Sequence, residues 1–328
     1  MSITGIVFPE EVEYGKGRAG VGWIFIAGRQ NLKDGKLGSL KTSLARGERT
    51  GEREIFARLP VASSLREKKV LLFGCGAIGS FVAVELARAG VGSLDLFDQD
   101  VVQPGNSLRW PLGRTALGIK KSVALYEFIL QNYPWTNISA YTGQLGFAPV
   151  DVTWLPPDFK TRPSPLDQLQ SLIQEADLII DATASTEVQH TLTIHCRELN
   201  KPYIIGYVTE GLAGGIVARF QPNSEICWVC VNEHWYDKNL QELRVDETGV
   251  LTPVGCNQPT FTGGGFDLQE VSLEIVRSAV GLLSNGAYDP GEWSLAILEL
   301  LDDDELRILP QWTVHSPAPH PLCCGSDK

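Results

Sequence analysis

The feature that most constrains the fold is a glycine-rich turn between an apolar run and a helical pattern. The run Val70–Phe73 is continuously apolar, as strands of a buried parallel sheet are. The turn Gly74–Gly79 has the spacing Gly-x-Gly-x-x-Gly, and Ser80–Ala89 after it predicts a helix. A second apolar run, Leu94–Phe97, ends at Asp98. This order of strand, glycine turn, helix and acidic strand end predicts a unit that binds a nucleotide.

Helices and strands continue to alternate after this unit. Helices are predicted over Lys120–Tyr133, Leu166–Glu175 and Thr186–Leu199, and strands over Leu178–Ile180 and Tyr203–Ile205. The rhythm predicts an α/β fold with a doubly wound, Rossmann-like, mostly parallel sheet. Five prolines between 147 and 165 predict a loop. From residue 214 isolated strands, a polar stretch over 232–250, a long helix over 267–283 and a terminal β pair predict a β-rich C-terminal elaboration.

The N-terminal part has a different composition. An aromatic and β-branched patch, Trp23–Ile26, predicts one or two strands within residues 1–28. Residues 29–62 are rich in Gly, Ser and charge, which predicts a linker with a short helix near its end. We therefore expect an extension over 1–62, which could be the remnant of an accessory domain, and a main domain over 63–328.

The charge of the chain excludes some classes of partner. Lys and Arg number 28 against 39 for Asp and Glu, a net charge of −11, so a general nucleic-acid binder is not expected. No apolar run approaches the roughly 20 residues of a membrane span. Met1–Ile6 does not resemble a secretory signal, and the seven cysteines are too few and uneven for a secreted disulfide scaffold. We expect a cytoplasmic protein without membrane or nucleic-acid partners.

Charged side chains near the glycine turn point to the kind of nucleotide. Asp98 and Asp100 follow the second strand, where two carboxylates can hold a ribose and a Mg²⁺ ion. Asn106, Arg109 and Lys121 come next and would surround a triphosphate with charge-assisted donors. A nicotinamide cofactor has no γ-phosphate that needs such a cluster. The pattern therefore favours ATP over a dinucleotide, and a Rossmann oxidoreductase remains an alternative.

With these motifs in this order, the segment 70–133 resembles the ThiF/MoeB/HesA family, the adenylation domain shared with ubiquitin-activating enzymes. The glycine turn, Asp-x-Asp, Asn-x-x-Arg, Gly-x-x-Lys and a later Asp-x-Thr all occur, and the likeness covers about residues 60–328. The resemblance implies that the chain binds Mg-ATP and adenylates the C-terminal glycine of a ubiquitin-like protein. Adenylation of a sulfur-carrier protein, a peptide or a tRNA base is the alternative. Some compact bacterial members serve antiphage defence.

The resemblance also assigns roles to individual residues. Asp98 resembles the ribose ligand, Asp100 a carboxylate of the Mg²⁺ or phosphate site, and Asp181, with Arg109 and Lys121, a catalytic residue. The full set of nucleotide contacts that it implies is Gly74, Gly76, Ala77, Gly79, Asp98, Asp100, Asn106, Arg109 and Lys121.

One position departs from the family pattern. After the later strand the family commonly reads Asp-x-Thr-Asp-Asn, and its second Asp serves Mg-ATP, whereas this chain has Ala184 there. Either Asp100 and Asp181 cover that role, or adenylation is impaired and the chain is a nucleotide-binding scaffold.

The resemblance implies a homodimer as well. Family members tend to borrow an Arg from an N-terminal segment, often that of a dimer partner. Residues 29–69 hold eleven Lys and Arg against five Asp and Glu, and Arg53 and Arg58 within this stretch are candidates. A solvated surface is the alternative for both.

Two pairs of cysteines predict a structural Zn²⁺ site. Cys227 and Cys230 are separated by two residues, and Cys323 and Cys324 lie near the C-terminus. Thiolates brought together from distant segments are typical zinc ligands. Because the second pair is adjacent and its geometry cramped, His320 could replace one thiolate; four ordinary thiols are the alternative.

Cys256 lies between the polar stretch and the long helix, at the distance where family members carry an acceptor cysteine. A thiolate beside a helix N-terminus and glycine amides has a lowered pKa and attacks acyl-adenylates readily. The resemblance therefore implies a thioester on Cys256 and a conjugating-enzyme-like partner that receives it. A buried structural thiol is the alternative.

Overall fold

The computed structural model describes residues 1–11, 17, 19–143, 166–246, 250–251, 260–261, 263–289, 291–302 and 305–325. Contacts between residues divide the chain into two units, Met1–Pro60 and Val61–Lys328.

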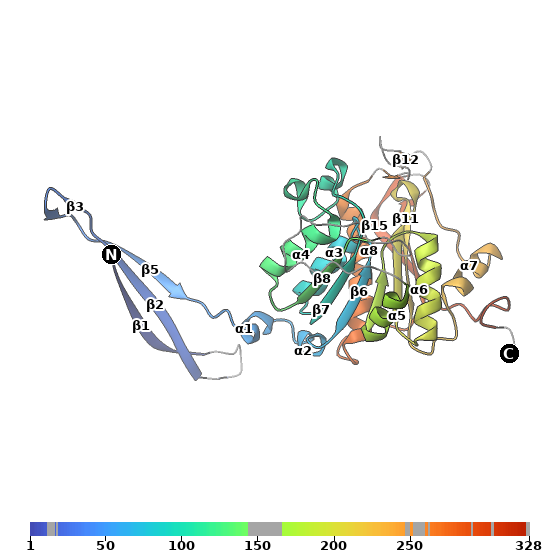
Figure 1. Ribbon diagram of the computed structural model, residues 1–328, viewed down its shortest axis with the longest axis horizontal. Coiled ribbons are helices and arrows are strands. Elements are labelled where there is room, and N and C mark those ends of the chain that lie inside the picture. Colours follow the sequence, from blue (N-terminus) through green and yellow to red (C-terminus); the bar gives the residue numbers. More distant parts are fainter. Residues whose placement is uncertain are drawn as a thin grey trace. The chain divides into compact units, whose positions relative to one another are not determined.

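The first unit is a three-stranded antiparallel sheet in the order β1-β2-β5 (Figure 1). Its elements are β1 (Ser2–Glu11), β2 (Ala19–Arg29), the short pair β3 (Leu32–Lys33) and β4 (Lys36–Leu37), β5 (Lys41–Gly47) and the helix α1 (Glu52–Phe56). Trp23 and Phe25 stack on one face of β2, with ring centroids 5.9 Å apart. The short helix predicted before residue 62 is confirmed, but the linker prediction is wrong over β5, which pairs with β2 along its whole length.

The second unit contains an eight-stranded sheet in the order β15-β14-β11-β10-β9-β6-β7-β8. Five neighbouring strands, from β10 to β8, run parallel, and β11, β14 and β15 are antiparallel to their neighbours. This arrangement confirms the predicted α/β fold with a mostly parallel sheet and a β-rich C-terminal part. The strands are β6 (Lys69–Phe73), β7 (Ser93–Phe97), β8 (Asn137–Tyr141), β9 (Leu178–Asp181), β10 (Tyr203–Val208), β11 (Gly214–Phe220), β14 (Leu295–Asp302) and β15 (Glu305–His315), with a separate pair β12 (Val250–Leu251) and β13 (Thr260–Phe261).

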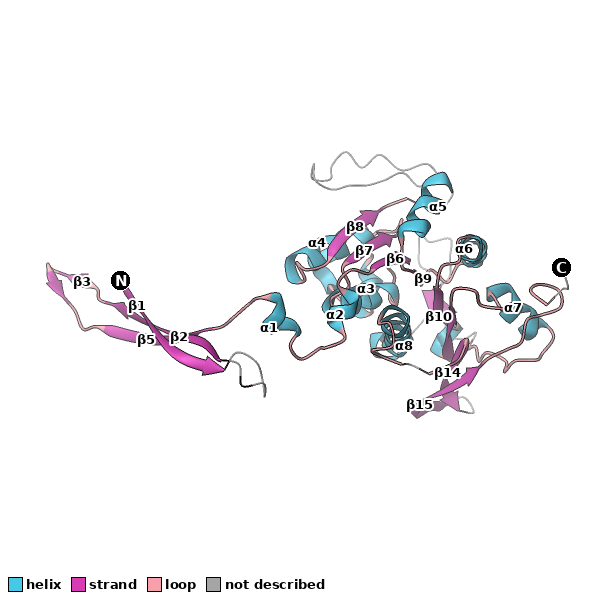
Figure 2. Cartoon of the chain, turned by 90° about the horizontal axis from the view of Figure 1, so that it is seen from below, coloured by secondary structure: helices cyan, strands magenta, loops and turns pink. Residues whose placement is uncertain are grey.

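Helices cover both faces of this sheet (Figure 2). One layer consists of α3 (Gly79–Arg88), α4 (Lys121–Asn132) and α8 (Gly265–Leu283), and the other of α5 (Leu166–Glu175), α6 (Thr186–Glu198) and α7 (Trp228–Tyr236). The smaller helical elements are α2 (Ala62–Leu65), η1 (Pro104–Leu108), η2 (Gly113–Ala116) and η3 (Glu210–Leu212).

The core lies on both sides of the parallel strands. Along β6, Val70 and Leu72 belong to the cluster under α3 and α8, whereas Leu71 and Phe73 belong to the cluster under α5 and α6. Successive side chains of a strand point to opposite faces, so a strand covered on both sides must be apolar throughout. This is why the run at residues 70–73 predicts its strand so clearly.

Several predicted elements need correction. The helix α7, which extends to Tyr236 at the start of the polar stretch, was not predicted. The strands expected to be isolated after residue 214 are not, since β11 pairs with both β10 and β14. β8 was not predicted. The loop expected over 147–165 lies outside the described residues.

The topology places a ligand site at one edge of the sheet. The chain moves from β6 toward β7 and β8 in one direction, and from β9 toward β10 in the other. The switch point is therefore between β6 and β9, and ligands of such sheets bind beyond the carboxyl ends of the strands there. Within the described part of the chain, no helix has the length and apolar character that crossing a membrane requires.

Candidate nucleotide site and cysteine cluster

The glycine turn leaves β6 at this switch point, and its glycines have different reasons to be there. Gly74 has φ +86°, and a Cβ on it would lie 2.6 Å from the carbonyl oxygen of Ala182. A Cβ on Gly79 would lie 1.8 Å from the carbonyl oxygen of Gly74. A Cβ on Gly76 would meet no atom within 4 Å, and Gly76 lines a cleft beyond the carboxyl ends of the strands. Gly74 and Gly79 are therefore required by the turn itself, whereas Gly76 leaves space for a ligand.

Asp98, at the end of β7, is held by backbone donors of this turn. The amide of Cys75 donates to its Oδ2 and the amide of Asp100 to its Oδ1, each at 2.7 Å. Burial raises the pKa of Asp98, against the lowering effect of the Lys121 ammonium and of the two amides. The carboxyl group is fixed in orientation and lines the cleft, as a ligand for sugar hydroxyls must be.

Lys121, the first residue of α4, places an ammonium group at the site. Its Nζ lies 2.8 Å from Oδ2 of Asp100. The Lys121 side chain is 12% exposed and that of Asp100 is 59% exposed. Burial opposes the charge on Lys121, but the carboxylates of Asp98 and Asp100 outweigh it and raise the pKa of the lysine. Lys121 is therefore charged at neutral pH and lies at the border of the cleft.

The cleft consists of two hollows of about 230 and 210 Å³, which share Gly76, Lys121, Ala182 and Thr183. The first is also lined by Gly74, Asp98, Asp100, Ser185 and Val188. The second is also lined by Ala77, Asn106, Arg109, Ala184 and Tyr207. Of the predicted nucleotide contacts, all but Gly79 line one hollow or the other, and Gly79 supports the turn between them.

Asp181 lies behind this cleft. Its Oδ1 accepts hydrogen bonds from the amide and hydroxyl of Thr183, at 2.8 and 2.7 Å, and its Oδ2 accepts one from the hydroxyl of Tyr203 at 3.1 Å. Burial raises its pKa to about 6, although these bonds act against the shift. Both oxygens thus already have protein partners, and the catalytic role expected for Asp181 stays a prediction.

Ala184 has φ +55°, a left-handed conformation that Asn and Asp adopt more readily than Ala. It lines the second hollow. The departure from the family pattern therefore leaves an apolar methyl group where a carboxylate could project.

The four predicted zinc ligands come together. The Sγ atoms of Cys227, Cys230, Cys323 and Cys324 all lie within 4.8 Å of one another. Cys227 and Cys323 are 3.5 Å apart, and Cys324 is 3.6 Å from each of them. Zn–S bonds of about 2.3 Å in a tetrahedron give S···S edges of about 3.8 Å, so the spacing fits a zinc ion.

His320 does not replace a cysteine in this cluster. Its Nε2 pairs with Oδ2 of Asp237 at 3.0 Å, and its Nδ1 accepts from the amide of Leu322 at 3.2 Å. Its backbone amide donates to Sγ of Cys230 at 3.5 Å. The alternative in which His320 is a ligand is therefore not supported, and the residue instead supports the loop that carries the second pair.

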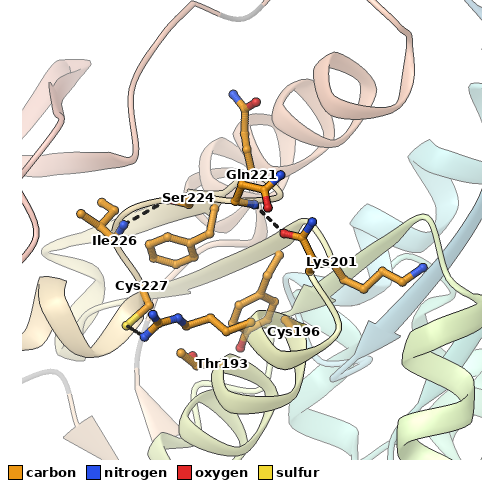
Figure 3. Close-up of a pocket in the computed structure, with 12 residues that line it drawn as sticks. Thr193, Cys196, Lys201, Gln221, Ser224, Ile226 and Cys227 are labelled. Atoms are coloured by element: carbon orange, nitrogen blue, oxygen red, sulfur yellow. Dashed lines mark hydrogen bonds between the residues drawn. The ribbon is translucent and has the colours of Figure 1, made fainter. Parts of the chain in front are cut away.

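A third cavity, of about 390 Å³, borders the cysteine cluster (Figure 3). Cys227 forms part of its wall, together with Thr193 and Cys196 of α6. The guanidinium of Arg197 donates to Sγ of Cys227 at 3.7 Å. A cation beside this thiolate offsets some of the negative charge that four thiolates would place around a metal.

Some predicted residues cannot be placed in this site. Cys256 lies outside the described residues, as does the side chain of Arg53. Arg58 belongs to the first unit.

Among the cleft residues that were not predicted, Trp110 and Tyr207 are polar and aromatic. Trp110 donates from Nε1 to the carbonyl oxygen of Cys75 at 2.8 Å and so holds the glycine turn. Tyr207 lines the second hollow from the end of β10. No motif marks either residue, because their positions follow from the packing of elements distant in the sequence.

Comparisons with known proteins show the family and the fold of this chain. A family model described as the ThiF family matches residues 52–283. The uncharacterized protein y4oA of Sinorhizobium fredii is 47% identical over all of this chain and 54% of its own length. The ATP-dependent ubiquitin transferase-like protein Cap2 of Enterobacter hormaechei is 27% identical over 80% of this chain and 44% of its own. This chain thus spans about half the length of these relatives.

A solved structure shows the same fold. The crystal structure of E. coli MccB with ATP superimposes with a TM-score of 0.55 and 17% identity, over 80% of this chain and 68% of MccB. The family model covers well over half of the chain, and the glycine turn and the switch point lie inside the matched range. This chain belongs to the ThiF family.

Proposed function

We propose that this protein is an ATP-dependent adenylyltransferase that activates the C-terminal carboxylate of a ubiquitin-like protein. The observation that carries the proposal is the placement of Lys121 between two carboxylates, beside the open glycine Gly76, at the switch point of the sheet. A site for a dinucleotide would need only the glycine turn and one acidic residue at the end of a strand. Lys121, with Asn106 and Arg109 in the second hollow, would supply the donors for a triphosphate.

The reaction requires positioning rather than acid–base chemistry. A carboxylate oxygen of the acceptor attacks the α-phosphorus of ATP, the bond from that phosphorus to the bridging oxygen breaks, and pyrophosphate leaves with the electron pair. The acceptor is already ionised at neutral pH, so no base is needed. In this proposal Asp98 binds the ribose, while Asn106, Arg109 and Lys121 bind the phosphates.

Asp100 fits as the residue that would hold Mg²⁺. Its carboxylate is mostly exposed at the cleft, and Mg²⁺ is commonly bound by one or two carboxylates together with substrate phosphates. The ion would neutralise charge on the phosphates. Lys121, at 2.8 Å, would keep this carboxylate in place.

The cysteine cluster fits a structural Zn²⁺ ion held by Cys227, Cys230, Cys323 and Cys324. Such an ion would tie the segment after β15 to the start of α7. We expect the purified protein to contain one zinc per chain by elemental analysis. A Cys324→Ser variant should lose the metal and melt at a lower temperature.

The acceptor and the later steps are the finer part of the proposal. Cap2 is described as a ubiquitin transferase-like protein, which favours a ubiquitin-like acceptor, and the chain would then act as a homodimer and pass its product on through a thioester at Cys256. The thiolate would attack the acyl carbon of the adenylate and release AMP. A sulfur-carrier protein, a peptide or a tRNA base remains the alternative substrate, and a nucleotide-binding scaffold is favoured if Ala184 abolishes the reaction.

Intact-mass spectrometry separates these possibilities. The purified protein is mixed with Mg-ATP and a ubiquitin-like protein encoded beside it, with and without a thiol reductant. We expect AMP and pyrophosphate, and a reductant-sensitive adduct that Cys256→Ala abolishes. AMP and pyrophosphate without an adduct would leave an adenylating enzyme without a thioester step. If neither product forms, a nucleotide-binding scaffold becomes the function that the site supports best.

A further inference from the structure

The second hollow of the cleft has a charge composition suited to two anionic groups. Arg109 and Lys121 line it, and none of its described lining residues carries a carboxylate. Ala184 contributes a methyl group to its lining. An α-phosphate and a second anion, such as an acceptor carboxylate, would meet these two cations there, whereas Asp100, whose carboxylate lies 2.8 Å from Nζ of Lys121, lines the first hollow.

Tyr207 also lines this hollow. It lies at the carboxyl end of β10, and its ring packs edge-on against Trp228 with centroids 6.2 Å apart. Within the described part of the chain, its hydroxyl makes no hydrogen bond to protein. A half-buried hydroxyl without a partner is costly unless a ligand or water supplies one.

The phenol would act as a neutral donor. Burial alone raises the pKa of Tyr207 to about 12, so the hydroxyl keeps its proton at neutral pH. The other tyrosine of this strand, Tyr203, faces the same layer of helices, but its hydroxyl is already bonded to Asp181. Of the two, only Tyr207 borders the second hollow.

We propose that the Tyr207 hydroxyl binds the reacting carboxyl group of the acceptor and so orients it toward the α-phosphate. This inference rests on the proposed adenylation and names a positioning residue within that site. The packing against Trp228 would fix the Tyr207 ring. Because Ala184 has only a methyl group, the carboxylate of the acceptor would have room beside it.

The test uses a stable mimic of the acyl-adenylate, 5′-O-[N-(N-acetylglycyl)sulfamoyl]adenosine, with AMP as the reference ligand. Affinities are measured by titration calorimetry for the wild type, for Tyr207→Phe, which keeps the ring against Trp228, and for Tyr236→Phe. Tyr236 is 84% exposed on α7 and is the matched control. A lost hydrogen bond to an acyl oxygen should weaken mimic binding about tenfold in Tyr207→Phe. AMP affinity should stay within about twofold, as should both affinities of Tyr236→Phe.

Each other result has a distinct meaning. If Tyr207→Phe binds the mimic as the wild type does, or loses mimic and AMP equally, Tyr207 does not position the acyl group and the inference is overturned while adenylation stands. If the wild type itself binds the mimic no better than AMP, acyl adenylation fails, and this inference fails with it.

Discussion

At the scale of single residues, Lys121 is a cation that lines both hollows of the nucleotide cleft. Its side chain is 12% exposed and its ammonium interacts with the carboxylates of Asp98 and Asp100, so it is held in place before a ligand arrives. Charge-assisted hydrogen bonds of this kind contribute about 1.5–3 kcal/mol, which is about 10- to 100-fold in affinity. Lys121→Ala should therefore raise the Kd for Mg-ATP by that factor, as measured by titration calorimetry.

The neighbouring lysine provides the control for this change. Lys120 donates to the carbonyl oxygen of Gln99 and does not line either hollow of the cleft. Lys120→Ala should leave the Kd within about threefold. Equal losses in the two variants would mean that α4 binds ATP through its general charge, and the specific role of Lys121 would be wrong.

Asp181 should make stability depend on pH. Its folded pKa of about 6 lies above the ordinary value of 3.8, so between these values the folded state holds more protons than the unfolded state. Stability from this group therefore falls as pH rises through that window, by at most about 3 kcal/mol. Asn cannot titrate, so the free energy of unfolding of the wild type relative to Asp181→Asn should fall between about pH 4 and pH 7.

Urea unfolding at several pH values measures this difference directly. A constant difference across the range would show that Asp181 has an ordinary pKa. That result would suggest that solvent or a ligand group reaches the carboxylate, and would favour its predicted catalytic role.

At the scale of elements, the glycine turn separates the requirements of folding from those of binding. Gly79→Ala would place a Cβ 1.8 Å from a backbone oxygen, so the turn must shift, at a cost of about 1–3 kcal/mol or more. A Cβ on Gly76 would meet nothing within 4 Å, and Gly76 has no left-handed φ. The free energy of unfolding of Gly76→Ala should therefore differ from that of the wild type by less than about 1 kcal/mol. Its methyl group would nevertheless occupy space on the cleft and weaken ATP binding.

Melting temperature and ATP titration on both variants test this division. We expect Gly76→Ala to melt like the wild type and bind ATP at least about tenfold more weakly. Wild-type affinity in Gly76→Ala would mean that the phosphates do not approach this part of the turn.

The elements also show what a sequence can and cannot reveal. The strands β6, β7 and β9 were predictable because burial on both faces demands continuous apolar residues. β5 was not, because its side chains are charged or exposed and its strand conformation comes from pairing with β2. β8 lies at the sheet edge, where Asn137–Tyr141 mixes polar and apolar residues.

The same contrast applies to the site. The residues of the glycine turn and the four cysteines lie in short motifs, and chemistry alone suggests their roles. Tyr207 has no such signal, because only the register of β10 brings it to the cleft. The hydrogen bond from the Tyr203 hydroxyl to Asp181 likewise forms because β9 and β10 are neighbours in the sheet.

At the scale of the whole molecule, the two units differ in whether each is expected to fold by itself. Both hydrophobic cores lie entirely within Val61–Lys328, as do all the described residues that line the cleft. The first unit has large apolar side chains exposed on its sheet, Leu44 at 74% and Ile3 at 63% among them. A small sheet with so little burial is not expected to fold by itself.

A chain trimmed to residues 61–328 should therefore remain folded and bind Mg-ATP with a Kd within about threefold of the full chain, since the donors in the cleft are unchanged. Circular dichroism checks the fold and titration calorimetry the affinity. A folded but tenfold weaker protein would show that residues 1–60 supply a cation to the triphosphate, as the sequence suggested for Arg53 or Arg58. Single substitutions of these two arginines to Ala in the full chain would then identify which one is responsible, because neither change removes a residue of the described cores.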